Sequence, residues 1–172
     1  MHNTAIPLFI NPAAGRGRAG RKLGAIRTLF DAQGIAHSVI QSNAPGDLEQ
    51  RVYDAACAGT SKLIVAGGDG SIHEAVNGIM RSRKTSGLGV IPIGTGNDFA
   101  KASGIPLHWE DAVLLLAGRL LAGAPARPVD VGRMNDRFFA NGAGIGFDAK
   151  VTRIARANRL PIGDLVYLLA VI

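Results

Sequence analysis

The 172-residue chain contains one cysteine, Cys57, which excludes an internal disulfide framework and a cysteine-based zinc site. Aromatic residues make up only 5% of the sequence, so a stacking platform for single-stranded nucleic acid is not expected. The first residues lack the basic region and the long apolar core typical of a signal peptide, and the most apolar internal stretch, 112–121, is much shorter than the roughly 20 residues that cross a bilayer. We expect a cytoplasmic protein with no nucleic-acid partner and at most peripheral membrane contact, in which Cys57 is a buried small residue.

The P-loop motif G-x-x-x-x-G-K-[ST] is also missing, which excludes a P-loop ATPase. The chain is basic, with a formal charge of +6. The positive charge favours acidic partners such as nucleotide phosphates or an anionic membrane surface. Four basic residues lie close together at Arg16, Arg18, Arg21 and Lys22. Steering of a nucleotide or a lipid headgroup and a solvated helix start explain this group equally well.

Short apolar runs alternate with segments of helical periodicity, and glycine marks the changes, a pattern typical of βα units around a parallel sheet. The expected fold class is therefore α/β, a Rossmann-like parallel sheet flanked by helices. The expected strands are 6–10, 38–41, 62–66 and 88–91, and the expected helices are 19–33, 48–58, 72–81, 98–103 and 109–121.

The character of the sequence changes at 122–128, where glycine, alanine and proline cluster. Beyond this point, 129–134 and 137–141 flank an Asn-Asp pair, which predicts a β-hairpin. We expect residues 1–128 to form an α/β domain that binds a nucleotide and residues 129–172 to begin a β-rich second domain.

The most informative segment runs from Leu63 to Glu74, where a buried strand passes through GGDG directly into a helix. Glycines let backbone N–H groups approach a phosphate, and a helix start adds roughly half a positive charge, so the segment predicts a phosphate cradle. Asp69 inside such a cradle indicates a bridging cation such as Mg²⁺, or a proton acceptor for a hydroxyl. Ser71 and Glu74 also have the spacing of a capping box, which would make Ser71 the N-cap.

Two other loops follow strands in the same way. The segment 91–99, IPIGTGNDF, places glycines, a hydroxyl and an Asn-Asp pair after one strand, and 11–17, NPAAGRG, follows the first strand. Ligands of open parallel sheets bind at the carboxyl ends of the strands, so all three loops are expected at one edge. Their convergence predicts a nucleotide site there.

Taken together, Asn11-Pro12, the run Gly67 to Ser71 and the run Pro92 to Ala100 resemble, in order and spacing, the three signatures of the diacylglycerol kinase catalytic-domain family. The likeness extends from Asn11 to about Phe147. GGDG alone also occurs in NAD kinases and phosphofructokinases, whereas the loop from Gly94 to Ala100 is typical of the lipid kinases.

The resemblance implies ATP and Mg²⁺ as cofactors and transfer of the γ-phosphate to a lipid hydroxyl at a membrane surface. Ser42 stands where the family more often has threonine, and the hydroxyl is kept. The ATP-binding positions implied are Asn11, Ser42, Gly67, Gly68, Asp69, Gly70, Ser71, Ile72, His73, Gly94, Thr95 and Asn97. The acidic residues implied to organise magnesium are Asp69, Asp98 and Asp130, with Asp69 as the catalytic residue.

Diacylglycerol or a related lipid is the expected acceptor, and a sphingoid base is an alternative because 73–78, HEAVNG, is similar to sphingosine kinases. An NAD kinase, a non-catalytic nucleotide-binding regulatory module and a homodimer stay open. Family members continue into a β-rich domain that carries a further acidic segment. The apolar run 166–172 would have nothing to cover it, so we expect a fragment of a longer kinase and leave the activity of the fragment alone open.

Overall fold

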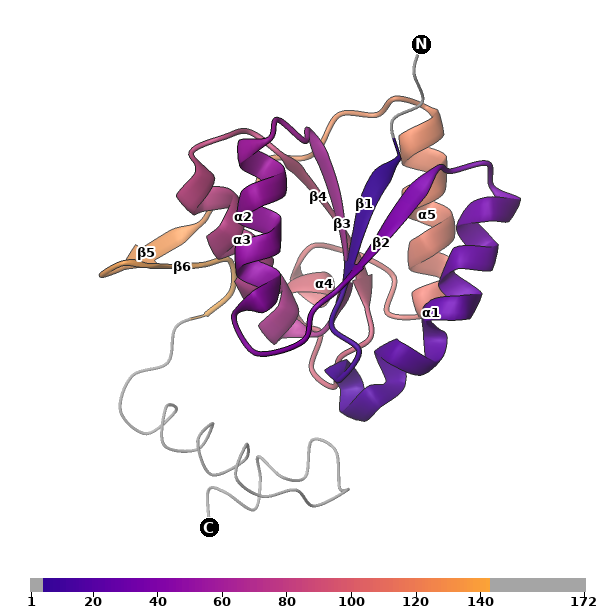
Figure 1. The fold of residues 1–172 in the computed structure, drawn as a ribbon, viewed down its shortest axis with the longest axis horizontal. Helices are drawn as coiled ribbons and strands as arrows, with labels where there is room; N and C mark the ends of the chain where they lie inside the picture. The colour runs from indigo at the N-terminus through magenta and orange to yellow at the C-terminus, as the bar shows by residue number, and fades with distance from the viewer. Residues whose placement is uncertain (1–4, 143–172) are drawn as a thin grey trace. The chain divides into compact units, whose positions relative to one another are not determined.

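A computed structural model describes residues 5–142 of the protein, nearly all of them in the first of two compact units, Met1–Ala140. The predicted apolar run at the C-terminus lies outside the described residues, and the domain boundary expected near residue 128 stays a prediction. The main element is a four-stranded parallel sheet in the order β2-β1-β3-β4 (Figure 1). Its strands are β1 (Ile6–Ile10), β2 (His37–Gln41), β3 (Lys62–Gly67) and β4 (Gly87–Pro92).

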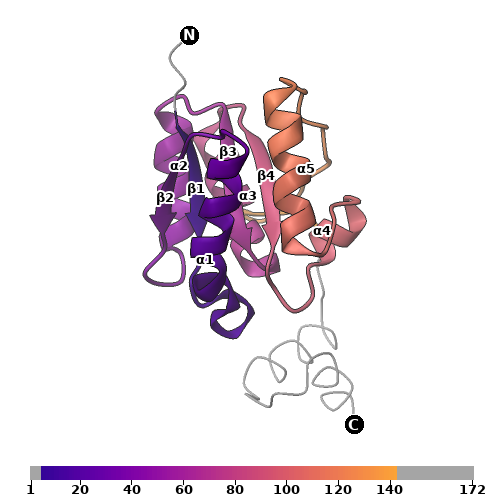
Figure 2. The ribbon, with the colours of Figure 1, turned by 90° about the vertical axis from the view of Figure 1, so that its right-hand side faces the viewer.

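Helices cover both faces of this sheet, with α1 and α5 on one face and α2 and α3 on the other (Figures 1 and 2). They are α1 (Ala14–Ala32), α2 (Asp47–Cys57), α3 (Asp69–Ser82), the short α4 (Asp98–Ala102) and α5 (Trp109–Leu121). Among the described residues, 5–142, none of the helices combines the length and apolarity needed to cross a membrane.

The central strands are apolar on both sides because each side meets a helical layer. In β1, Leu8 and Ile10 join the core under α1 and α5, whereas Phe9 points to the opposite core under α2 and α3. All three side chains are fully buried. This two-sided burial explains why the strands appear in the sequence as short continuous apolar runs rather than as alternating patterns.

Every strand and helix predicted for this sheet is present, with ends that agree or differ by a few residues. Within α1, Gly15, Arg16 and Gly17 have left-handed backbone angles, so the regular part of this helix begins after Gly17, close to the predicted start at residue 19. The larger difference is at α3, which begins at Asp69 rather than at residue 72. The predicted burial of Cys57 is wrong, since this last residue of α2 is exposed.

The predicted hairpin is also present, as β5 (Gly132–Met134) and β6 (Arg137–Phe139), paired antiparallel. Asn135 in its turn has φ of 53°, a left-handed conformation that asparagine tolerates better than most residues. The hairpin lies against α3, where Phe138 packs beside a buried cluster that contains Ile72 and Val76.

Glu49 connects α2, α3 and the hairpin. Its carboxylate, on a side chain with only 8% exposure, accepts hydrogen bonds from Arg81 at 2.7 Å and from Arg137 at 2.8 and 3.1 Å. Burial raises the pKa of the Glu49 carboxyl, but the hydrogen bonds from Arg137 and Arg81 outweigh burial and leave the pKa below its ordinary value of 4.5. The ionised form is therefore the one that the fold stabilises.

Glu49→Gln should make the protein less sensitive to acid. A carboxyl whose pKa is lower in the folded state stabilises the fold above its unfolded-state pKa and loses that contribution as the pH falls through the folded-state pKa. We expect the variant to be less stable at neutral pH by about 1–3 kcal/mol, and to lose less stability than the wild type below about pH 5. Urea unfolding followed by circular dichroism across this pH range measures both effects. Asp136→Asn, at a side chain with 98% exposure on the hairpin turn, is the control and should leave the wild-type pH profile unchanged.

Candidate functional site

Three loops lie against one another at the carboxyl ends of β1, β3 and β4. Gly15, after β1, has φ of 59°, and a Cβ atom there would overlap the carbonyl oxygen of Ile93, after β4. A Cβ atom on Gly68, after β3, would lie 2.8 Å from Cα of Gly94. Because backbone touches backbone at these positions, side chains are excluded from them. The loops are thus packed into one structure at the edge where the sequence predicts the site.

The β3 loop leads into α3 without a side-chain cap on the helix start. Gly68 is the N-cap residue, and no side chain forms a hydrogen bond that caps it. The first N–H groups of a helix have no acceptor within the helix, and the helix dipole adds positive potential there. Gly70, in this first turn, is exposed and has no neighbouring atom within 4 Å of the position of a Cβ atom. An anion can therefore approach the backbone of this turn directly.

The predicted capping box is wrong. Because α3 begins at Asp69, Ser71 lies within its first turn and is buried there. The Glu74 carboxylate does not return to the helix start but accepts a hydrogen bond at 3.3 Å from the backbone N–H of Glu49 in α2. Glu74 therefore joins two helices, and the start of α3 is left to the loop glycines.

Two carboxylates border the same small space beside this helix start. A Cβ atom on Gly96 would lie 3.0 Å from Oδ2 of Asp69 and 3.3 Å from Oδ2 of Asp98. The other oxygen of Asp69 accepts a hydrogen bond from the N–H of Phe99 at 3.1 Å, which ties α3 to α4. Asp98 forms an exposed ion pair with Lys101 at 3.1 Å. Oxygen donors of this kind, one or two carboxylates completed by phosphates and water, are the ligands that Mg²⁺ prefers.

The third aspartate of the predicted magnesium set is not part of this arrangement. Asp130 is exposed in the segment that joins α5 to β5. Within residues 5–142, no group of three or more His, Cys, Asp or Glu side chains is placed to hold a metal ion. The described residues therefore supply a pair of carboxylates rather than the predicted set of three.

In the β4 loop, Asn97 has a structural role. It is buried with φ of 54°, its Oδ1 accepts the N–H of Gly94 at 2.8 Å, and its Nδ2 donates to the Gly94 carbonyl at 3.1 Å. Arg18 of α1 donates to the same carbonyl at 2.7 Å. Thr95, between the two glycines of this loop, is exposed. The loop is held in shape by Asn97 and Arg18 while Thr95 faces solvent.

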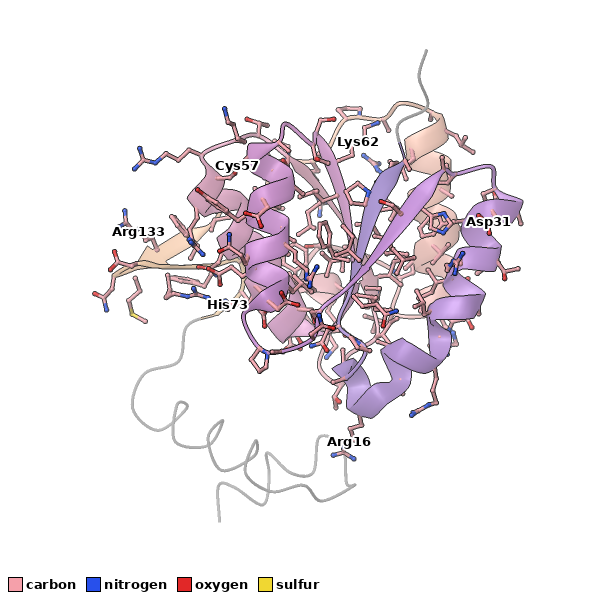
Figure 3. All side chains as sticks on the ribbon, in the orientation of Figure 1. Arg16, Asp31, Cys57, Lys62, His73 and Arg133 are labelled. Atoms are coloured by element: carbon pink, nitrogen blue, oxygen red, sulfur yellow. The ribbon has the colours of Figure 1, made fainter. Side chains whose placement is uncertain are left out.

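Two further predicted positions, Asn11 and Ser42, lie at the ends of neighbouring strands. Asn11 follows β1, and its Oδ1 accepts the N–H of Ala13 at 3.0 Å. Ser42 follows β2, is 8% exposed, and its N–H donates to the carbonyl of Ile10 at 2.9 Å. His73 is exposed on α3 (Figure 3), and its ring nitrogen Nε2 lies 3.3 Å from the guanidinium of Arg137.

A hollow of about 250 Å³ adjoins the β4 loop on the side of α1 and α5. Arg18 and Lys22 line it together with Gly94, Asn97 and Trp109, and the Lys22 ammonium lies 4.7 Å from the centre of the Trp109 ring. Arg16 projects from the start of α1 (Figure 3). The basic group noted in the sequence is therefore distributed around the loops, with Arg18 and Lys22 directly beside the site.

Sequence reasoning missed the bond from Arg18 to Gly94, because it joins residues 76 positions apart. The only signal was the position of Arg18 directly after the glycines that follow β1. It also missed that the glycines of different loops touch each other, which no spacing within one loop reveals.

Comparisons with known proteins show which family and which fold the chain is similar to. A family model described as the diacylglycerol kinase catalytic domain matches residues 5–134. The chain is 35% identical over 163 residues to a diacylglycerol kinase of Bacillus subtilis (strain 168), a match covering 94% of the chain and 52% of that protein. It is 38% identical over 157 residues to a Pseudomonas aeruginosa protein called "Probable lipid kinase YegS-like", covering 91% of the chain and 45% of that protein.

The fold is also similar to a solved structure of a diacylglycerol kinase from Bacillus anthracis str. Sterne. That similarity has a TM-score of 0.66 and 29% sequence identity, and it covers 78% of this chain and 47% of the other. The chain thus spans about half the length of the curated relatives that it matches.

Gly68→Ala should destabilise the protein, because the added methyl group would lie 2.8 Å from the backbone of Gly94. We expect a loss of about 1–3 kcal/mol in unfolding free energy, as for other overpacked sites. Gly24→Ala is the matched control, since Gly24 lies in α1 with open space around it, and should be neutral or stabilising by about 0.5–1 kcal/mol. Equal stabilities for the two variants in urea unfolding would contradict the close packing of the loops.

Proposed function

The chain belongs to the diacylglycerol kinase catalytic-domain family, and on that basis we propose that it is the ATP-binding part of a lipid kinase. The observation that carries the proposal is the start of α3, which has no side-chain cap, is open at Gly70 and lies beside the carboxylates of Asp69 and Asp98. The proposed acceptor is the hydroxyl of diacylglycerol or a related lipid. A sphingoid base is the alternative acceptor that the HEAVNG run keeps open.

In this proposal the loops hold the phosphates of ATP. The N–H groups of the first turn of α3 receive phosphate oxygens, and Arg18 and Lys22 add positive charge beside the β4 loop. Asn11 and Ser42, at the ends of β1 and β2, and the exposed Thr95 complete the proposed nucleotide contacts. Positioning and charge neutralisation provide most of the catalysis in phosphoryl transfer, so a rigid loop assembly suits the reaction.

Asp69 is the proposed catalytic residue. Mg²⁺, when bound, would neutralise phosphate charge, and Asp69 and Asp98 are the described residues that would hold it. The predicted third member, Asp130, is not grouped with these two in the described part of the chain. In the transfer, the lipid hydroxyl oxygen forms a bond to the γ-phosphorus and ADP leaves as the bond to its bridging oxygen breaks. The hydroxyl proton passes to a base. Asp69 is the candidate among the described residues, and the family resemblance implies that the acidic segment of the second domain is associated with the same role.

The proposed lipid acceptor places the reaction at a membrane surface. Acyl chains keep such a lipid in the bilayer, and the formal charge of +6 favours approach to anionic headgroups. The basic residues around the start of α1 are the proposed point of approach. The homodimer that the sequence leaves open stays open.

Asp69→Asn should abolish most of the transfer without unfolding the protein. The asparagine keeps the size of the side chain and an oxygen for the N–H of Phe99, but it removes the charge. We expect kcat to fall by about 10²- to 10⁴-fold, the range found for catalytic acids and bases. The assay follows labelled phosphate from ATP to a panel of diacylglycerol, a sphingoid base and NAD, with the full-length protein. Transfer to NAD and to no lipid would contradict the proposal, and ATP binding without transfer to any acceptor would favour a regulatory module.

Gly70→Ala tests the phosphate contact separately. The methyl group meets no protein atom, so stability should be unchanged or slightly higher, whereas a phosphate at the helix start would be displaced. We expect the affinity for ATP to fall by about tenfold, or roughly 1.4 kcal/mol, when measured by isothermal titration calorimetry. Gly24→Ala again serves as the control with unchanged affinity. An ATP affinity in Gly70→Ala equal to that of the wild type would place the phosphates elsewhere.

A further inference from the structure

Asn77 holds the hairpin on α3 in the way that a neighbouring strand would. Its amide is fully buried, and its Nδ2 donates to the carbonyl of Phe138 at 2.9 Å while the N–H of Phe138 donates to its Oδ1 at 3.0 Å. The same Nδ2 donates to the carbonyl of His73 one turn earlier in α3 at 2.8 Å. Both backbone groups of one strand residue are thus satisfied by a single helical side chain, which fixes the register of β6 on the helix.

A second attachment lies next to the first. Arg137, the residue before Phe138, donates to the buried carboxylate of Glu49 and lies 3.3 Å from the ring of His73. Glu49 is also bound by Arg81 of α3. The hairpin is therefore held at two consecutive residues by groups that belong to α2 and α3.

The attachment is close to the proposed nucleotide site. The ring of Phe138 packs against the buried cluster that includes Ile72, in the first turns of α3, and Phe99. The N–H of Phe99 donates to Asp69. One packed cluster therefore connects the contact between the hairpin and α3 to the first turn of α3 and to Asp69, the proposed catalytic residue.

We propose that Asn77 is a positioning residue that fixes the hairpin, and with it the point where the chain leaves the first compact unit at Ala140, relative to the nucleotide loops. This inference rests on the proposed function. The curated relatives are about twice as long as the matched region, so in a full-length kinase the following part of the protein is joined through this point. Transfer of a phosphoryl group is sensitive to such placement, since a displacement of about 1 Å can reduce a rate by about 10²-fold.

The test compares Asn77→Asp with Asn135→Asp in the full-length protein. Both changes replace an amide by a carboxyl group of almost the same size, but Asn135 is exposed in the hairpin turn. At Asn77 an oxygen replaces the nitrogen that donates to the carbonyls of His73 and Phe138, so both hydrogen bonds are lost and the carboxylate oxygen faces two carbonyl oxygens. Asn77→Ala, which removes both bonds to Phe138, is the second variant.

In both Asn77 variants we expect hydrogen–deuterium exchange in the peptide 132–139 to become at least about tenfold faster, which corresponds to roughly 1.4 kcal/mol of lost local stability. The kcat for transfer to the lipid should fall by about 10- to 100-fold. The Kd for ATP should stay within about threefold of the wild-type value, a change of less than roughly 1 kcal/mol. Asn135→Asp should match the wild type in all three measurements.

Three results would overturn the inference: unchanged exchange in the hairpin of both Asn77 variants, faster exchange with unchanged kcat, or ATP affinity lost in proportion to kcat. The last would mean that Asn77 only supports the fold of α3. If the wild-type protein transfers phosphate to no lipid, the proposed function fails by itself. The role of Asn77 in holding the hairpin is then decided by exchange and ATP affinity. Faster exchange in the hairpin of the Asn77 variants with unchanged ATP affinity supports that role, and unchanged exchange overturns it.

Discussion

The contact between bare backbones at Gly68 and Gly94 is the constraint on which the rest of the site depends. Two strands, β3 and β4, end side by side, and their loops can cross only where neither carries a Cβ atom. This crossing places the start of α3 beside the β4 loop and brings Asp69 within reach of the N–H of Phe99. The site therefore needs glycine for two reasons: the protein's own packing and, in the proposed function, room for the phosphates.

Different glycines along the chain meet these two requirements. Gly68 and Gly94 are filled on the side of their missing Cβ atoms by protein backbone, whereas Gly70 faces open space. A glycine-rich motif thus contains residues that build the loop and a residue that leaves room beside it. Asn97 is another residue of the motif that builds the loop, because both polar groups of its side-chain amide form hydrogen bonds with Gly94.

Much of the fold could be predicted from the sequence because each strand is a short apolar run and each helix has a clear period. The predicted strand Ile6–Ile10 and helix Trp109–Leu121 agree with the structure at both ends. The start of α3 was harder to predict, because Ser71 and Glu74 have the spacing of a capping box. In the structure the Glu74 carboxylate instead accepts a hydrogen bond from the N–H of Glu49 in α2. Asn77 was missed for a related reason. A polar residue in a helix is predicted to face solvent unless the strand that forms hydrogen bonds with its side chain is already known.

The hollow beside the β4 loop contains the chain's one tryptophan, Trp109, on its wall. Indole emission responds to nearby charge, and the ring here has the Lys22 ammonium 4.7 Å from its centre, with Gly94 and Asn97 lining the same space. Within this chain, a change in indole emission on adding a ligand therefore comes from Trp109 alone. The molecule carries an intrinsic optical probe for events at the β4 loop, without any chemical label.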